Sequence, residues 1–230
     1  QDIRIAMVSD LHITSYTRQA SMQKLVDRLN AIDADIVVFV GDIVDGDVRP
    51  YEEKGVPAIF QGIKSRHGFY GVLGNHEYHG GAVDKAVELF TASGMTLLRD
   101  QVAVIDALNL SILGRDDSRV RRITGSERLS ATELIATAKD GSLLLSLDHQ
   151  PQLAMEAKEA GVDLQLSGHT HNGQVFPANL IVKKIYDNPW GHKTYDAVFD
   201  LIVSCGYGTW GPPMRTRSFS EIVVLELIGK

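Results

Sequence analysis

Several apolar runs along the chain have the length and composition of buried strands. They are residues 3–8, 36–40, 69–73, 143–147, 164–166, 197–204 and 221–227. Nearly continuous apolar runs of this kind are typical of strands that are covered on both faces. Two or three further strands are expected between residues 95 and 113, around a tight turn at 106–109.

Other segments have apolar residues at helical spacing or carry helix-end signals. The predicted helices are residues 18–30, 82–93, 130–138 and 151–160. The first shows the pattern most clearly, because its apolar residues recur every three to four positions. In the third, Ser130 and Glu133 have the spacing of a capping box. Alternating strands and helices, followed by a β-rich second half, predict a layered α/β architecture.

The composition is that of an ordinary globular protein. Among 230 residues, 44% are hydrophobic and 23% are charged. No repeat, low-complexity stretch or linker interrupts the pattern. A single domain over residues 1–230 is therefore expected, because one continuous core is feasible at this length.

The charge balance bears on the class of partner. The formal net charge is −6, and this argues against nucleic-acid binding, which depends on a basic patch. The charge is compatible with a small phosphorylated substrate, because bound metal cations would reverse the local field. Cys205 is the only cysteine, so no disulfide can form within the chain, and this says little about the compartment.

The N-terminus gives an expectation about location. No apolar stretch reaches the roughly 18 residues that a helix needs to cross a bilayer. The chain begins at Gln1, without an initiator methionine, and runs directly into the first expected strand. We therefore expect that a membrane or export segment precedes this domain in the native protein, which would then be membrane-associated or exported.

Polar side chains that can bind metal follow five of the apolar runs, at the point where each run ends. These are Asp10 and His12, Asp42 and Asp45, Asn75 and His76, His149, and His169 and His171. In α/β sheets, binding sites form at the carboxyl ends of the strands. Each motif alone could also be explained without metal binding, as a solvated turn, an Asx turn or an exposed histidine. The five together, in this order, predict a metal site.

The donor types narrow the choice of metal. The candidate ligands combine imidazoles, carboxylates and one amide oxygen: Asp10, His12, Asp42, Asn75, His149, His169 and His171. Without a thiolate, this set suits Mn, Fe, Zn or Mg rather than a structural zinc of the cysteine type. The set is too large for one tetrahedral ion and fits two divalent ions that share a carboxylate. We expect Mn²⁺ to be the ion that restores activity most effectively.

The same residues carry a resemblance to the calcineurin-like metallophosphoesterase superfamily. Its blocks are Asp-x-His, Gly-Asp-x-x-Asp, Gly-Asn-His-Asp/Glu, a later His, and Gly-His-x-His. All five are present in order, at residues 10–12, 41–45, 74–77, 149 and 168–171. The resemblance implies a four-layer α-β-β-α sandwich of two mixed sheets. It also implies that one metal binds Asp10, His12 and His171, that the other binds Asn75, His149 and His169, and that Asp42 bridges them.

Other segments narrow the resemblance to one branch of the superfamily. Residues 147–151, 167–174 and 208–215 are similar to a bacterial branch of membrane-associated or exported phosphodiesterases and phosphohydrolases. Residues 114–117 resemble a Gly-x-Asp-Asp element of that branch, with Arg115 as an unusual filler. The roles of Arg115, Asp116 and Asp117 are left open by the sequence.

The expected reaction is hydrolysis of a phosphodiester or pyrophosphate bond in a small substrate by a metal-bound hydroxide. His76 is the candidate general acid, with Asp45 as the carboxylate that orients it. The alternative for His76 is a purely structural bond within its loop. Arg215 is a candidate for binding phosphate, weighed equally against a structural arginine in a loop. Trp210 is expected in the core, and Glu77 is expected to face solvent or to cap the next segment.

Three other functions remain open from the sequence. A non-catalytic binding scaffold of the same fold comes from a different class, and the complete ligand set argues against it. A protein phosphatase would need an open groove for a folded substrate, whereas the short loops favour a small one. A nuclease is disfavoured by the acidic balance. Neither the physiological substrate nor the oligomeric state can be deduced from the sequence.

Overall fold

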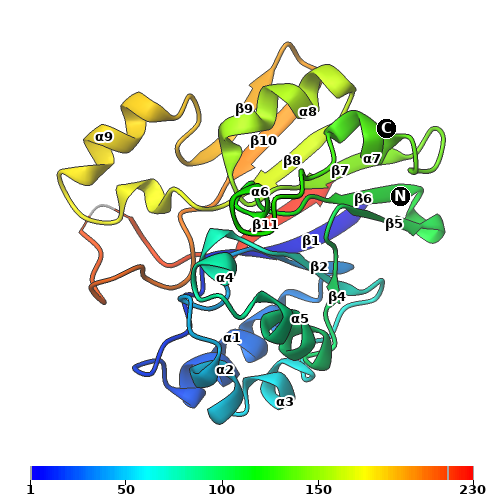
Figure 1. The fold of residues 1–230 in the computed structure, drawn as a ribbon. Helices are drawn as coiled ribbons and strands as arrows, with labels where there is room; N and C mark the ends of the chain where they lie inside the picture. Colours follow the sequence, from blue (N-terminus) through cyan, green and yellow to red (C-terminus); the bar gives the residue numbers. More distant parts are fainter. Residues whose placement is uncertain (1, 217, 230) are drawn as a thin grey trace.

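The computed structural model describes residues 2–216 and 218–229 and shows two mixed β-sheets packed face to face (Figure 1). The strands of the first sheet, in spatial order, are β11 (Val223–Leu227), β1 (Ile3–Val8), β2 (Ile36–Val40), β3 (Phe69–Val72) and β4 (Thr96–Leu97). Those of the second are β5 (Gln101–Ile105), β6 (Leu110–Gly114), β7 (Leu143–Leu147), β8 (Leu164–Ser167), β10 (Phe199–Val203) and β9 (Gly191–Tyr195).

Helices cover the outer face of each sheet. The first sheet is covered by α1 (Gln19–Ile32), α2 (Arg49–Glu53), α3 (Val56–Phe60) and α5 (Val83–Ala92). The second sheet is covered by α7 (Ala131–Ile135) and α8 (Ala154–Ala160). The predicted four-layer α-β-β-α sandwich is therefore confirmed.

The apolar strand runs follow from this layering. Along β2, Ile36, Val38 and Val40 point into the core between the sheets. Val37 and Phe39 of the same strand point into the core under the helices. A strand between two apolar layers has no polar face, so its sequence reads as continuous rather than alternating.

The sequence predicted most elements to within a few residues, and the differences have local causes. The capping box of Ser130 and Glu133 is confirmed at the start of α7. The sequence did not predict α2, α3, α4 (Asn75–His79) and α6 (Val120–Thr124), because five residues are too few to show helical spacing. It also missed α9 (Ala178–Ile185) and the polar edge strand β9.

The topology brings five loops to one place. β1, β2 and β3 are parallel neighbours, as are β6, β7 and β8. The loops that follow parallel strands leave a sheet at the same edge, so side chains from both sheets can meet there. Among the described residues, no helix is long and apolar enough to cross a bilayer.

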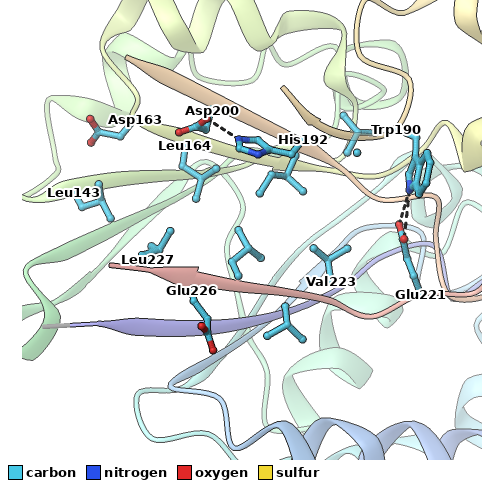
Figure 2. A pocket seen from close by; sticks show the side chains of 15 residues that line it. Leu143, Asp163, Leu164, Trp190, His192, Asp200, Glu221, Val223, Glu226 and Leu227 are labelled. Atoms are coloured by element: carbon cyan, nitrogen blue, oxygen red, sulfur yellow. Dashed lines mark hydrogen bonds and ion pairs between the residues drawn. The ribbon is translucent and has the colours of Figure 1, made fainter. Parts of the chain in front are cut away.

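A second feature of the fold lies at the open side of the sandwich, where β11 faces β8 and β10. We call it the edge groove: a hollow of about 550 Å³ lined by apolar residues such as Leu164, Ile202 and Val223. Figure 2 shows His192 hydrogen-bonded to Asp200 on its rim. The groove shares no lining residue with the candidate metal ligands.

Candidate metal centre

The structure brings all seven predicted ligands to the carboxyl edge of the two sheets. Six of them, together with His76, form three overlapping groups, and within each group the ligand atoms lie within 4.8 Å of one another. The groups are Asp10 with His12 and His171, His12 with Asp42 and His76, and Asp42 with His149 and His169. Asp42 belongs to two groups, as expected of a shared carboxylate. Asn75 is buried in the same region, at the start of α4.

The backbone at these positions is unusual. Asp10, His12, Asp42, His169 and His171 all have positive φ, between 44° and 71°. Non-glycine residues rarely adopt this conformation, and such strain gathers at functional sites. A strained backbone that aims five of the candidate ligands at one region is an observation independent of sequence motifs.

Two glycines of the motifs allow the loops to approach closely. A Cβ added to Gly74 would collide with the backbone and side chain of Asp42. A Cβ added to Gly168 would collide with the Asp10 carboxylate. These glycines are therefore required by packing around the carboxylates and not by their own backbone angles.

In the first group, two imidazoles face one carboxylate. The Nε2 atoms of His12 and His171 are 3.0 Å apart, and His171 Nε2 is 3.4 Å from Asp10 Oδ1. Burial lowers the pKa of His171 to about 4, so its ring is neutral at physiological pH. Imidazole nitrogens and a carboxylate that converge in this way match the coordination chemistry of a divalent cation.

Near the group of Asp42, His149 and His169, the side chain of Asn75 has a buried oxygen, Oδ1, without a hydrogen-bond partner among the described residues. Buried oxygens normally have a partner, so an oxygen left without a protein donor fits a metal ligand. His149 Nε2 lies 3.1 Å from Asp42 Oδ2, and His149 Nδ1 contacts Val40 O at 2.8 Å. A carbonyl that accepts from one ring nitrogen leaves the other free to bind metal. The donor set therefore fits divalent metal ions.

Asp42 and His149 each shift the pKa of the other. Burial alone would raise the pKa of Asp42, but His149 outweighs burial and lowers it well below the ordinary value. Burial alone would lower the pKa of His149, but the Asp42 carboxylate raises it. His169 behaves differently, because burial lowers its pKa to about 4.

His76 and Asp45 form the hydrogen-bonded pair that the sequence suggested. His76 Nδ1 is 2.8 Å from Asp45 Oδ1, which also lies 3.2 Å from His12 Nδ1. Burial would lower the pKa of His76, but the bond to Asp45 and the charge of Asp42 outweigh it and raise the pKa. His76 Nε2 lies 4.0 Å from Asp42 Oδ2, so the free nitrogen faces the cluster.

Glu77 holds the loop that carries Asp42. Its buried carboxylate accepts the backbone N–H groups of Asp42, Ile43, Val44 and Gly74. The bond to Gly74 is the predicted cap, whereas the solvent-facing alternative is wrong. Burial, together with the charge of Asp42, raises the pKa of Glu77 to about 7.

Arg215 and Trp210 lie beside the cluster in the loop before β11. The guanidinium of Arg215 donates to the carbonyls of Cys205, Gly206 and Gly208 and to Ser218 Oγ. These bonds favour the structural alternative, and the substrate-binding role stays a prediction. Trp210 is 55% exposed, so the expectation that it lies in the core is wrong.

The 114–117 segment supports the loop of His149. Buried Arg115 lies 3.4 Å from the carboxylate of Asp148, the residue before His149. Asp117 accepts from the side chain of Gln150, the residue after it. Asp116 accepts from Tyr78 OH on α4. The segment therefore positions the residues on both sides of His149 and contributes no ligand atom to the metal groups.

A groove of about 690 Å³ opens over the cluster, and we call it the metal groove. Asp42, Asn75, His76, His169 and His171 lie on one side of it. His79 and Arg119 also line it, as do Val175, Ala178, Val182, Trp210, Pro212 and Met214.

The sequence missed Arg119. Within the described residues its guanidinium makes no hydrogen bond or ion pair, although its charge helps to lower the pKa of His79 after the larger effect of burial. Nothing in the sequence separates Arg119 from the nearby Arg121 and Arg122. Its place is set by the turn before α6, where its N–H donates to Asp117.

Comparisons with known proteins agree with this geometry. A family model described as calcineurin-like phosphoesterase matches residues 3–173. An uncharacterised metallophosphoesterase of Campylobacter jejuni is 33% identical over 232 residues, covering 100% of this chain and 60% of that protein. One of Aquifex aeolicus is 30% identical over 230 residues, covering 100% of this chain and 86% of the relative.

A solved structure agrees as well. A dimetal phosphatase from Danio rerio matches with a TM-score of 0.56 at 12% identity, covering 92% of this chain and 89% of that one. At this identity the likeness shows a shared fold. The chain spans about 60% of the length of the Campylobacter relative and of a similar protein of Helicobacter pylori.

Proposed function

Because the chain belongs to the calcineurin-like phosphoesterase family, we propose that it hydrolyses phosphodiester or pyrophosphate bonds of a small substrate at two divalent metal ions. The observation that carries this proposal is the position of Asp42, which groups with His12 on the side of Asp10 and His171 and with His149 and His169 on the other side. All seven predicted ligands are present and buried or half-buried at that point.

The residues divide into two sets around Asp42. Asp10, His12 and His171 would hold one ion, and Asn75, His149 and His169 would hold the other. Ions held there would lower the pKa of bound water and offset the charge of the phosphoryl oxygens. Mn²⁺ is the ion we expect to be most effective, with Fe, Zn or Mg as alternatives.

The proton for the leaving oxygen comes from His76. Its Nδ1 is held by Asp45 at 2.8 Å, which orients the ring and stabilises its protonated form. Its Nε2 faces the cluster, where it can donate to an alkoxide that leaves phosphorus. Asp45 therefore acts on the reaction through His76.

Arg119 supplies a positive charge that the sequence did not indicate. Arg119 lines the metal groove, and its guanidinium has no hydrogen bond or ion pair within residues 2–216 and 218–229. A guanidinium binds two phosphate oxygens at once, so we assign Arg119, rather than Arg215, to the phosphoryl group of the substrate.

The groove favours a small substrate over a folded protein or a duplex. Its volume of about 690 Å³ is that of a small-molecule site. A net charge of −6 disfavours a nuclease. A non-catalytic scaffold would have no need for strained backbone at five ligand positions.

One comparison of substrates tests the proposal. We expect bis(nitrophenyl) phosphate to be hydrolysed faster than nitrophenyl phosphate, a phosphoprotein or single-stranded DNA, in the presence of Mn²⁺. Preference for the phosphoprotein or for DNA would replace the proposal with a phosphatase or a nuclease. Inactivity on every substrate, with two metals bound, would favour the scaffold.

A further inference from the structure

The helix α9 stands apart from both sheets (Figure 1). None of its residues is buried, and its main contact is with the short turn His171–Gly173. Ala178, Ile181, Val182 and Ile185 are spaced so that they share one face. A helix of a globular protein normally buries such a face against the core, and this one does not.

The exposed apolar surface extends beyond the helix. On this face of α9 and in the segments next to it, the residues that are at least half exposed are Phe176, Ile181, Ile185, Trp210 and Met214. They come from α9, from the turn that precedes it and from the loop before β11. Together with Lys183 and Lys184 we call these residues the α9 surface. The loop and the helix meet at the metal groove, which Ala178, Val182, Trp210 and Met214 all line, and exposed apolar side chains that lie together mark an interaction site.

The charge at this surface differs from that of the whole chain. Lys183 and Lys184 are exposed on α9, and no ion pair involves them within the described residues. α9 itself contains no acidic residue, although the chain carries a net charge of −6. An apolar face flanked by lysines, with tryptophan nearby, has the composition of helices that lie in the headgroup layer of a membrane.

The surface is also continuous with the metal groove. Ala178 and Val182 of the same helix face line that groove, as do Trp210 and Met214. The groove therefore opens between the metal cluster and an apolar rim.

We propose that the α9 surface docks the protein on an anionic lipid bilayer. The apolar residues enter the interface while Lys183 and Lys184 bind anionic headgroups. Docking in this way turns the mouth of the metal groove toward the headgroup layer. The proposal goes beyond the hydrolytic function and does not depend on it. A second copy of the chain is a poorer occupant, because it would bring the same two lysines against each other.

Vesicle binding tests the proposal. We expect the protein to sediment with vesicles of phosphatidylcholine mixed with phosphatidylglycerol, and much less with phosphatidylcholine alone. The double variant I181S/I185S should bind the anionic vesicles at least about tenfold more weakly, because it loses buried apolar area. The double variant K183Q/K184Q should lose about tenfold or more, since each lysine near an anionic surface contributes to binding.

Matched controls lie elsewhere on the surface. V198S removes an exposed apolar side chain from the loop between β9 and β10, and K24Q removes an exposed charge from α1. Neither should change vesicle binding. Hydrolysis of a soluble nitrophenyl diester should be unchanged in all four variants, which shows that they fold.

Three outcomes would overturn the proposal. One is the absence of binding to anionic vesicles, another is binding that either double variant leaves unchanged, and the third is a wild-type dimer that I181S/I185S dissociates. The two proposals fail separately. Binding without hydrolysis would support docking and refute the phosphoesterase, whereas hydrolysis without binding would do the reverse.

Discussion

Two histidine–aspartate pairs lie beside two hollows of similar size, and only one pair is next to the candidate metal ligands. His76 and Asp45 are 2.8 Å apart beside the metal groove of about 690 Å³. His192 and Asp200 are 2.7 Å apart on the rim of the edge groove of about 550 Å³ (Figure 2). Neither the bond length nor the hollow separates them.

The two pairs differ in burial and in the residues next to them. The side chains of His76 and Asp45 are 15% and 26% exposed, whereas those of His192 and Asp200 are 59% and 44% exposed. The ring of His76 also lies 4.6 Å from that of His12, a candidate ligand. The metal groove lies where the carboxyl ends of parallel strands meet, while the edge groove runs along the sides of β11, β8 and β10. The candidate metal ligands therefore lie at the strand ends, where sites form in α/β sheets, and the presence of a hollow alone does not identify a site.

The largest expected effect comes from the carboxylate that the two metal groups share. Asp42→Asn should reduce bound metal from about two ions to one or fewer and should nearly abolish hydrolysis, because both ions lose a shared charge. Metal analysis of the purified variant, next to wild type, measures this. Two bound ions and full activity in the variant would show that Asp42 does not bridge the ions. They would also weaken the distinction between the metal groove and the edge groove.

His76 should matter for the reaction and not for the metals. His76→Asn should lower turnover of an alkyl diester by about 10²–10⁴-fold with both ions retained, because general acid catalysis contributes that much. The loss should be smaller for a nitrophenyl diester, whose leaving group needs no proton. An equal loss on both esters would assign His76 to metal geometry. No loss on either would leave it a structural residue.

Arg119 should act on the substrate alone. Arg119→Ala should lower kcat/KM by about 10- to 100-fold, the worth of a hydrogen bond to a charged group. Arg121→Ala is the matched control, because that arginine lies two residues further along the chain, on α6, and pairs with Glu127. Steady-state kinetics of both variants with metal content measured would decide. A similar loss in the control would remove Arg119 from the site.

The pair at the edge groove should have the smallest effect. His192→Ala should leave turnover unchanged and lower the free energy of unfolding by less than about 1 kcal/mol, as exposed ion pairs do. Chemical denaturation and the diesterase assay give the two values. A large loss of turnover would mean that the edge groove also takes part in the reaction.

The sequence could predict which side chains gather at the candidate metal centre, because each follows an apolar run that is easy to recognise. The order of the runs predicted a layered α/β architecture, and the resemblance to the superfamily implied the four layers. What it could not predict depends on contacts between distant segments. The carboxylate of Glu77 is buried because four backbone N–H groups donate hydrogen bonds to it. The guanidinium of Arg215 donates hydrogen bonds to carbonyl groups of its own loop. Neither fact has a local pattern in the sequence.

The α9 surface is a different case. The helical spacing of Ala178, Ile181, Val182 and Ile185 is present in the sequence. The segment is short and stands between a loop and a polar strand, and it was not predicted as a helix. Spacing alone would still have predicted a buried helix. Only the structure shows that the face has no partner among the described residues.

Metal removal and return is the most direct test of the central claim that Asp42 and its neighbours form a two-metal hydrolytic centre. Wild-type protein would be treated with a chelator, checked for metal content, and titrated with Mn²⁺ while hydrolysis of bis(nitrophenyl) phosphate is followed. The account predicts loss of activity with the metal and recovery that saturates near two ions per chain, with no recovery in Asp42→Asn. Hydrolysis that persists in metal-free protein, or full recovery in Asp42→Asn, would contradict it.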